Sequence, residues 1–312
     1  MAKILVTGGA GFIGATLVPA LLGAGHEIVV ADNFSRGVRD LLQPTPGLVV
    51  QEVDIRDTVA LADVAADCDG LIHLAAYGSV VESVTAPDEN FSVNVQGTFS
   101  VLQAARKAGV RRMIFASTGG ALIGNATPPV DERSVPRPIS PYGASKLAGE
   151  GYCCAFANSY GMDITALRFA NVIGPYSMHK KGAISNFFKA IIEDRPIIIY
   201  GDGTATRDYI YVADLCEGIG RAFAAEMSGF NVFHLASGCE VAVRELAEMC
   251  IRAAGKAEHP LVFEPRRDGE VDRNCASSLV ASQAIGFSPG HSLEQGLALT
   301  WSWFAANFRR GT

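Results

Sequence analysis

Apolar and polar positions alternate along the first half of the chain in blocks that predict strands and helices in turn. A short apolar run at 4–6 predicts a buried strand, and the stretch after it places Leu17, Val18, Leu21 and Leu22 on one face of a helix. Because this alternation continues, we expect an α/β fold built on a parallel, doubly wound sheet. Further apolar runs predict strands at 27–31, 48–53, 70–76, 111–116 and 163–169.

The regular alternation stops after the sixth predicted strand. Gly174 and Pro175 break the chain, and a helix over 184–193 and a short strand over 196–200 follow. We therefore expect a smaller C-terminal domain that lies over the crevice of the sheet and is interleaved with the first domain. The expected boundaries are 1–170, with 205–236 returning to it, for the first domain, and 171–204 with 237–312 for the second.

Three glycines follow the first strand at a spacing of three residues and precede a helix. Gly8 suits a tight turn, Gly11 suits close approach of the backbone to a pyrophosphate, and Gly14 suits packing of the helix on the strand. Free N–H groups at the start of this helix, near Phe12 and Ile13, suit an anion. The order of strand, turn and helix therefore predicts a dinucleotide site rather than a glycine-rich turn of another kind.

Polar side chains at the ends of the next strands extend this site. Asp32 follows the glycine loop by about 20 residues, where a ribose-binding carboxylate is expected. Its charge would repel a 2′-phosphate, so we expect NAD rather than NADP, although Arg36 nearby weakens this preference. Asp54 suits an adenine contact or the cap of the following helix, and both interpretations stay open. His73 resembles a catalytic base, but a packed histidine is the favoured interpretation.

Tyr142 and Lys146 share one face of a helix that Pro141 opens. A lysine ammonium nearby favours the phenolate and lowers the tyrosine pKa from its ordinary value of about 10. Together with the dinucleotide loop, the pair predicts proton transfer beside the cofactor.

Two further features of the sequence have two interpretations each. Ser117 and Thr118 suit a substrate contact or a local turn, and the basic stretch 179–181 suits a phosphate contact or a solvated turn.

Composition and charge exclude several classes of function. The 312 residues carry a net charge of −6 and no basic run, so nucleic acid is not an expected partner. No apolar stretch approaches the roughly 18 residues of a membrane helix, the chain enters a strand without a leader, and no membrane partner is expected. Seven scattered cysteines without metal-ligand spacing predict free thiols in a reducing cytoplasm and no metal site.

The motifs taken together resemble one family over almost the whole chain. The chain resembles the extended short-chain dehydrogenase/reductases, with their Rossmann-type fold, and within them the nucleotide-sugar 4-epimerases of the UDP-galactose (UDP-glucose) 4-epimerase type. The resemblance rests on TGGAGFIG (7–14), DNFSRG (32–37), DIRD (54–57), HLAA (73–76), NVQGT (94–98), STGGA (117–121), YGASK (142–146), RFANVIGP (168–175), GDGTATRDYIYVADL (201–215) and PRRDGE (265–270).

The resemblance implies a role for each matching residue. Tyr142 would be the base, Lys146 its electrostatic partner, and Thr118 a hydrogen-bond partner of the sugar O4. The substrate would be held by Thr118, Asn171, Arg207, Arg267 and Asn274. NAD would be held by Gly8, Gly11, Phe12, Ile13, Gly14, Asp32, Asn33, Ser35, Gly37, Asp54, Ile55, Leu74, Ala75, Ala76, Asn94, Ser117, Tyr142 and Lys146.

The implied reaction is inversion of C4 of a UDP-hexose through a transient 4-keto sugar, with hydride passing to NAD+ and back. The substrate would be UDP-glucose or UDP-galactose, or the N-acetylated pair, because Asn274 stands where a bulky residue excludes the acetamide. Gly119 and Gly120 replace the acidic pair of the dehydratases and argue against water loss. Gly78 stands where some epimerases place a lysine near the cofactor.

Two alternatives to an epimerase are kept. One is another nucleotide-sugar oxidoreductase or dehydratase on the same scaffold. The other is a non-catalytic NAD-binding protein, although such proteins typically lose the tyrosine–lysine pair that this chain keeps. The resemblance also implies a homodimer that packs two helices per subunit, near 95–108 and 143–158, into a four-helix bundle in a cytoplasmic enzyme.

Overall fold

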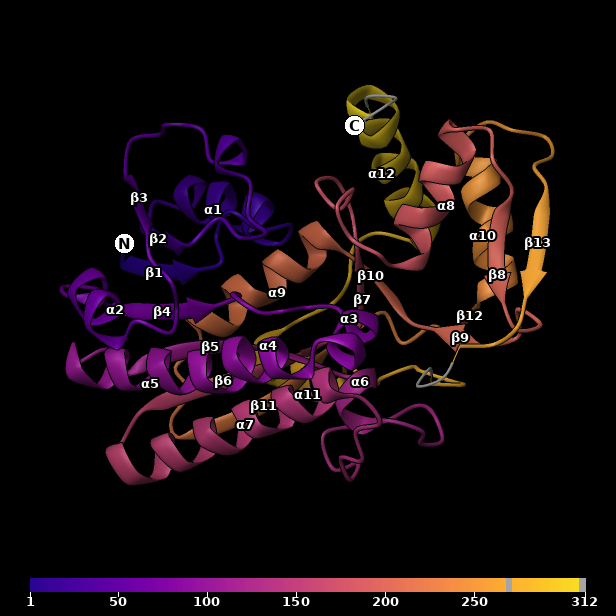
Figure 1. Cartoon of the computed structure of the whole chain (residues 1–312). Coiled ribbons are helices and arrows are strands. Elements are labelled where there is room, and N and C mark those ends of the chain that lie inside the picture. Colours follow the sequence, from indigo (N-terminus) through magenta and orange to yellow (C-terminus); the bar gives the residue numbers. More distant parts are fainter. Residues whose placement is uncertain (268–270, 309–312) are drawn as a thin grey trace.

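A seven-stranded parallel sheet forms the centre of the larger lobe (Figure 1). The computed structural model describes residues 1–267 and 271–308. The strand order is β11-β6-β5-β4-β1-β2-β3, which confirms the doubly wound α/β fold. The strands are β1 (Lys3–Thr7), β2 (Glu27–Asp32), β3 (Leu48–Glu52), β4 (Gly70–His73), β5 (Arg112–Thr118), β6 (Asp163–Phe169) and β11 (Phe230–Leu235).

Most strand boundaries follow the apolar pattern, and β6 spans the predicted residues. The prediction for β4 was too long, because the strand ends at His73 and not at residue 76. The chain bends there around the glycine loop: a Cβ on Gly8 would lie 2.6 Å from the backbone nitrogen of Ala75. In contrast, β5 is longer than predicted and includes Thr118, which pairs in register with Phe169 of β6.

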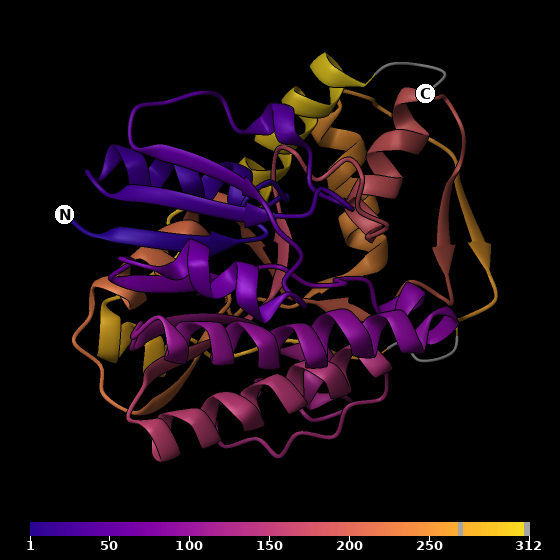
Figure 2. The same cartoon turned by 60° about the vertical axis from the view of Figure 1, so that its left-hand side comes forward.

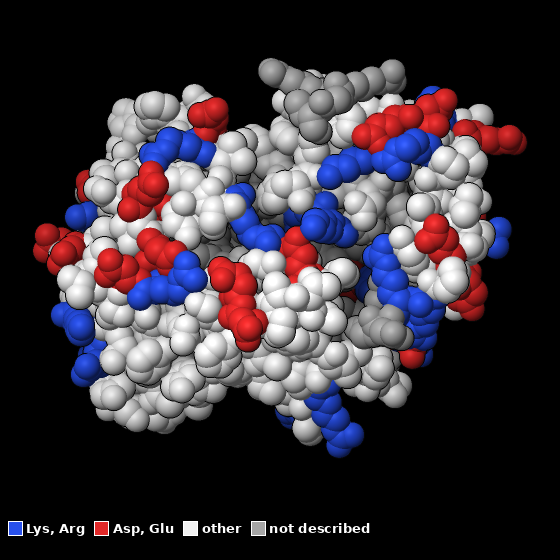
Figure 3. All heavy atoms as spheres, in the orientation of Figure 1, with Lys and Arg blue, Asp and Glu red and all other residues white. Residues whose placement is uncertain are grey.

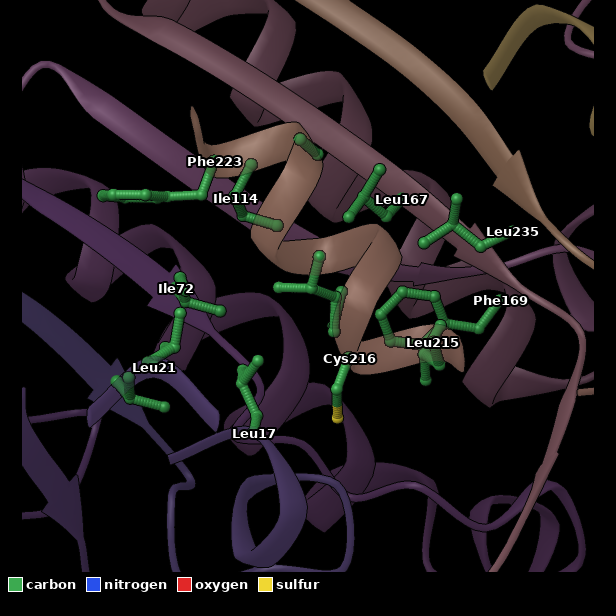
Figure 4. Close-up of a cluster of buried hydrophobic side chains, with 14 of the residues drawn as sticks. Leu17, Leu21, Ile72, Ile114, Leu167, Phe169, Leu215, Cys216, Phe223 and Leu235 are labelled. Carbon is green, nitrogen blue, oxygen red and sulfur yellow. The ribbon is translucent and has the colours of Figure 1, made fainter. Parts of the chain in front are cut away.

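One face of the sheet is covered by α1 (Gly14–Gly23), α9 (Val212–Ala224) and α11 (Leu279–Ile285). Leu17 and Leu21 of α1 and Leu215 and Phe223 of α9 meet there over the apolar side chains of β4, β5 and β6 (Figure 4). Pro19 lies inside α1 on its exposed side, and the helix runs through it.

The opposite face is covered by α2 (Thr58–Ala65), α5 (Gly97–Lys107) and α7 (Pro141–Tyr160). Asp57 caps α2 by accepting from the amides of Val59 and Ala60, so the cap interpretation of Asp54 is wrong. A π-helical turn, Ser92–Gln96, leads directly into α5. The shorter helices on this side are α3 (Val80–Thr85), α4 (Pro87–Phe91) and α6 (Gly120–Ile123).

A second, smaller lobe stands beyond the carboxyl ends of the strands (Figures 1 and 2). Its core packs α8 (Ala183–Ile192), α10 (Val243–Ala253) and α12 (Leu293–Asn307) against β8 (Ile197–Tyr200), which pairs with β13 (Leu261–Glu264). Short strand pairs connect the lobes: β7 (Asn171–Ile173) with β10 (Tyr209–Tyr211), and β9 (Thr206–Arg207) with β12 (Val241–Ala242). The residue boundaries of the two domains stay a prediction. Among the described residues, no helix has the length and apolarity that a membrane crossing requires.

Candidate active site

A cleft of about 980 Å³ lies between the carboxyl ends of the sheet and the second lobe. Parallel strands bring their carboxyl ends to one edge, where open α/β sheets bind ligands. The cleft is lined by every site residue predicted from the sequence except Asn94. Lys and Arg side chains gather around the hollow on this face of the molecule (Figure 3).

Asn94 is buried behind the cleft wall, in the π-helical turn. Its Oδ1 accepts a hydrogen bond of 2.7 Å from the backbone amide of Tyr77, and its Nδ2 donates one of 2.9 Å to Ser145 Oγ. Asn94 does not line the cleft within the described residues, and its contact with the cofactor stays a prediction. The side chain fastens the segment after β4 to α7, which explains an asparagine in the middle of a helix.

The glycine loop leaves no room for side chains. Gly8 has a φ of 71°, and a Cβ on Gly14 would lie 2.3 Å from the carbonyl oxygen of Gly9. No side chain of the described residues caps the N-terminus of α1, and Phe12, Ile13 and Gly14 at this end line the cleft. Tight backbone and free amides together fit a pyrophosphate.

Asp32 ends β2 and fixes the geometry of this site. Its Oδ2 accepts a 3.0 Å hydrogen bond from the amide of Ala10 in the glycine loop, and its Oδ1 accepts one of 2.9 Å from the amide of Phe34. Burial raises the pKa of this carboxyl above its ordinary value. A Cβ on Gly37 would lie 2.8 Å from Asp32 Oδ1, so a glycine is required opposite the carboxylate. These residues fit the adenosine half of a dinucleotide.

Two further side chains define the adenosine end. Arg36, which weakened the NAD preference, is held by Glu82 through an ion pair of 2.8 Å and stacks 4.1 Å from the ring centroid of Tyr77. Its guanidinium is thus already paired, which supports a free ribose hydroxyl over a 2′-phosphate. Asp54 pairs with Arg56, whose hydrogen bond holds the pKa of the carboxyl at about 2.

The predicted acid–base residues meet on the floor of the cleft. Burial raises the pKa of Tyr142 to about 12, and a hydrogen bond with Thr118 opposes the rise. The lowering of the Tyr142 pKa expected from Lys146 is not seen, because burial outweighs the hydrogen bond. Lys146 Nζ donates a 2.8 Å hydrogen bond to the carbonyl oxygen of Ala116. Burial lowers the pKa of this lysine to about 8. At neutral pH the pair is a phenol beside an ammonium.

Beneath the pair lies a buried ionic network that the sequence analysis did not identify. Glu150 stands one helical turn after Lys146 on α7. Its carboxylate accepts hydrogen bonds of 3.0 and 2.8 Å from Arg168 of β6 and one of 2.6 Å from Ser117 Oγ. Ser117 therefore faces Glu150 as well as the cleft. No spacing signal links residues on three separate elements, so only the fold reveals this network.

His73 is a packed histidine, as favoured from the sequence. It is buried against Phe115 and lies between the hydroxyls of Thr7 and Thr98, at 2.7 and 3.1 Å. Burial lowers its pKa to about 3. The ring is therefore neutral and hydrogen-bonded on both sides at neutral pH, and it does not line the cleft.

The predicted substrate residues line the opposite wall. Arg207 donates a 2.8 Å hydrogen bond to the Thr206 carbonyl, and Arg267 stacks 3.4 Å from the ring centroid of Tyr200. The buried carboxylate of Asp208, the next residue, accepts hydrogen bonds from the amide and hydroxyl of Ser237. Asn171 donates a 3.0 Å hydrogen bond to the Asp208 carbonyl. Residues 268–270 of the PRRDGE motif lie outside the described residues.

Asn274 lies directly against the segment that follows Thr118. A Cβ on Gly120 would lie 1.8 Å from Asn274 Nδ2, so the amide fills the space where a side chain at position 120 would stand. The sequence placed Asn274 in the substrate pocket only by resemblance. The contact with Gly120 brings it to the same end of the cleft as Thr118.

The two lysines of the basic stretch 179–181, for which a solvated turn and a phosphate contact were both open, have different surroundings. Lys181 forms an ion pair of 2.6 Å with Glu82, which also holds Arg36, and thus joins the second lobe to the first. Lys180 turns into the cleft, with its Nζ 4.9 Å from the ring centroid of Phe12. Ser79 caps α3 three residues before Glu82, a spacing that predicts a helix start but not this bridge.

Comparisons with known proteins agree with this geometry. Residues 4–236 match the NAD dependent epimerase/dehydratase family. The chain is 36% identical over 316 residues to a UDP-glucose 4-epimerase from Mycolicibacterium smegmatis, with 97% of this chain and 98% of the relative covered.

Two solved structures extend the likeness to the whole fold. A UDP-glucose 4-epimerase from Thermotoga maritima with UDP-glucose has a TM-score of 0.92 and 34% identity, and the match covers 97% of this chain and 99% of that one. A dTDP-glucose 4,6-dehydratase from Streptomyces venezuelae with NAD bound has a TM-score of 0.93 and 31% identity, with 98% and 97% covered. Family and site agree on NAD as the cofactor. The chain belongs to the NAD dependent epimerase/dehydratase family.

Proposed function

We propose that this protein inverts C4 of a UDP-hexose through a transient 4-keto sugar. The observation that carries the proposal is the placement of Thr118, Tyr142 and Lys146 on one floor of a cleft whose other end fits a dinucleotide. The chain is similar to UDP-glucose 4-epimerases over nearly its full length.

Each residue on the floor has a defined task in this reaction. NAD supplies the acceptor for the C4 hydride and its return. Tyr142 would take the proton from O4 as the phenolate and return it as the phenol, since one positioned group can serve first as base and then as acid. Thr118 is hydrogen-bonded to Tyr142 and orients its hydroxyl. Lys146 lies one helical turn away on the same helix face, and its positive charge, together with that of NAD+ beside the phenol, would favour the phenolate during the reaction.

The walls of the cleft support a nucleoside diphosphate as the handle of the substrate. Arg207 and Arg267 present planar guanidinium groups, which suit phosphate oxygens. Tyr200 and Ile198 of β8 line the cleft beside them and offer apolar surface to a base. A firmly held diphosphate and a loosely held sugar permit the 4-keto sugar to turn over between the two hydride transfers.

A dehydratase on the same scaffold is the competing function, because the fold is shared with one. Dehydratase relatives are expected to carry acidic side chains directly after the threonine. Gly119 and Gly120 provide none, and the amide of Asn274 occupies the space at position 120. Without an acid near C6, loss of water has no proton donor at that place. Epimerisation at C4 requires no such acid.

Proton NMR of the anomeric region tests the proposal directly. The purified protein is incubated with UDP-glucose and, separately, with UDP-N-acetylglucosamine, without added cofactor and then with NAD+. We expect the C4 epimer to appear. A 4-keto-6-deoxy product would establish the dehydratase instead, and no conversion of either substrate after NAD+ addition would refute a UDP-hexose epimerase.

We expect Asn274→Tyr to abolish conversion of UDP-N-acetylglucosamine while UDP-glucose conversion changes by less than about threefold. A phenol is larger than the amide that it replaces and would narrow the pocket that Asn274 lines, which leaves less room for an acetamide. Asn274→Ser, which leaves the space open, is the matched control and keeps both activities. The NMR assay measures both rates. Loss of both activities in the tyrosine variant would contradict a role in sugar size selection.

We further propose that the protein is a homodimer through α5 and α7. These helices lie side by side on one outer face (Figure 2). They expose the aromatic side chains of Phe99, Tyr152 and Tyr160, which are 38%, 43% and 51% exposed. Phe99 and Tyr152 contact each other edge-on with centroids 5.4 Å apart. An exposed apolar patch of this kind marks an interaction surface.

Light scattering at micromolar concentration measures the assembly. We expect twice the chain mass of 32.9 kDa for the wild type. Paired substitutions Phe99→Glu and Tyr152→Glu place charges on the patch and are expected to give the monomer mass. Val262→Glu, at an exposed apolar position of β13 in the other lobe, serves as the control. A monomeric wild type would overturn the dimer.

A further inference from the structure

The loop between β7 and α8 reaches from the second lobe across to the glycine loop of the first. Gly174 packs on Phe12: a Cβ at that glycine would lie 3.6 Å from the phenyl ring. Ser177 Oγ donates a 2.6 Å hydrogen bond to the Gly174 carbonyl, and Ser185 Oγ donates one of 2.9 Å to the Ser177 carbonyl. These bonds fix the loop between the two lobes.

The two lysines of this loop have different partners. Lys181 is neutralised by Glu82 at 2.6 Å, and that ion pair anchors the loop to the first lobe. Within residues 1–267 and 271–308, no carboxylate forms an ion pair with Lys180, and its Nζ lies 4.9 Å from the ring centroid of Phe12. Burial lowers the pKa of Lys180 to about 8, so most of the charge is kept at neutral pH. A partly desolvated cation without a counter-ion in the chain calls for an anion.

The position of Lys180 indicates which anion it would bind. Phe12 stands just before α1, whose N-terminus is capped by no described side chain and would suit a pyrophosphate. Lys180 approaches the same place from the second lobe. Gly78, an exposed glycine of the first lobe that lines the cleft, contributes no charge.

We infer that Lys180 holds the diphosphate of the cofactor from the side opposite α1, so that the second lobe closes over NAD and retains it through turnover. The inference rests on NAD binding alone and is independent of the identity of the sugar. A nucleotide sugar also carries a diphosphate, and the experiment separates the two.

The test compares Lys180→Met with wild type as purified holoenzyme. The measured quantity is the rate at which NAD+ appears in the filtrate after dilution, together with the NAD content per chain. We expect release to be about ten- to hundredfold faster, because a charge-assisted hydrogen bond is lost. Lys180→Arg keeps the charge and is expected to stay within a few-fold of wild type. Lys107→Met, at the exposed end of α5, makes the same charge change far from the cleft.

The second arm measures the affinity of the holoenzyme for UDP by calorimetry, and we expect it to change by less than about twofold. An NAD+ release rate for Lys180→Met within twofold of wild type would overturn the inference. If UDP affinity fell instead, Lys180 would belong to the substrate's diphosphate. Equal NAD loss in the arginine and methionine variants would also overturn it, because charge would then not be the cause.

Discussion

Replacement of Tyr142 by phenylalanine is expected to lower kcat on the order of a thousandfold while the protein keeps its NAD. The phenol is hydrogen-bonded to Thr118, and general acid–base catalysis contributes about 10²- to 10⁴-fold. Phenylalanine keeps the ring packing and removes only the hydroxyl. The NMR assay gives the rate, and acid release of bound NAD gives the cofactor content.

The matched control for this prediction is Tyr160→Phe. Tyr160 ends the same helix, is 51% exposed and lies far from the cleft lining. Its hydroxyl has no part in the proposed chemistry, so kcat is expected to stay within about twofold. A Tyr142→Phe variant with wild-type kcat and full NAD content would exclude Tyr142 as the proton carrier and, with it, the proposed mechanism.

Glu150→Gln is expected to lower the free energy of unfolding by about 3–5 kcal/mol. The substitution leaves the Arg168 guanidinium buried without its counter-charge, which is the costly way to break an internal ion pair. Both side chains of the pair are 6% exposed, so water does not compensate. Urea denaturation followed by circular dichroism measures the change.

A surface pair on α9 provides the comparison. Glu217 and Arg221 lie 2.7 Å apart with side chains 56% and 47% exposed. Glu217→Gln is expected to cost less than about 1 kcal/mol, because solvent screens the pair. Replacing both buried partners, with Glu150→Leu and Arg168→Met, is expected to recover part of the loss since no charge is left unpaired. Equal effects of Glu150→Gln and Glu217→Gln would contradict the buried network.

The order of elements and one half of the site were predictable from local sequence. An apolar run sets a buried strand by itself, and β6 has the predicted bounds. The glycine loop and Asp32 are also local features. The spacing of the glycines and the place of Asp32 at the end of a strand can be seen in a short stretch of sequence. Tyr142 and Lys146 lie one helical turn apart, a distance that the sequence fixes.

Contacts between distant segments were decided only by the tertiary structure. The pairing of Glu150 with Arg168, the amide of Asn274 against Gly120, and Lys180 beside Phe12 each join elements far apart in the chain. No periodicity encodes such contacts, because they depend on how the second lobe packs over the sheet. The partners of Asn94 could not be predicted for the same reason: Tyr77 and Ser145 come from two other segments. Local chemistry thus determined the cofactor loop and the catalytic helix, and packing determined what stands opposite them.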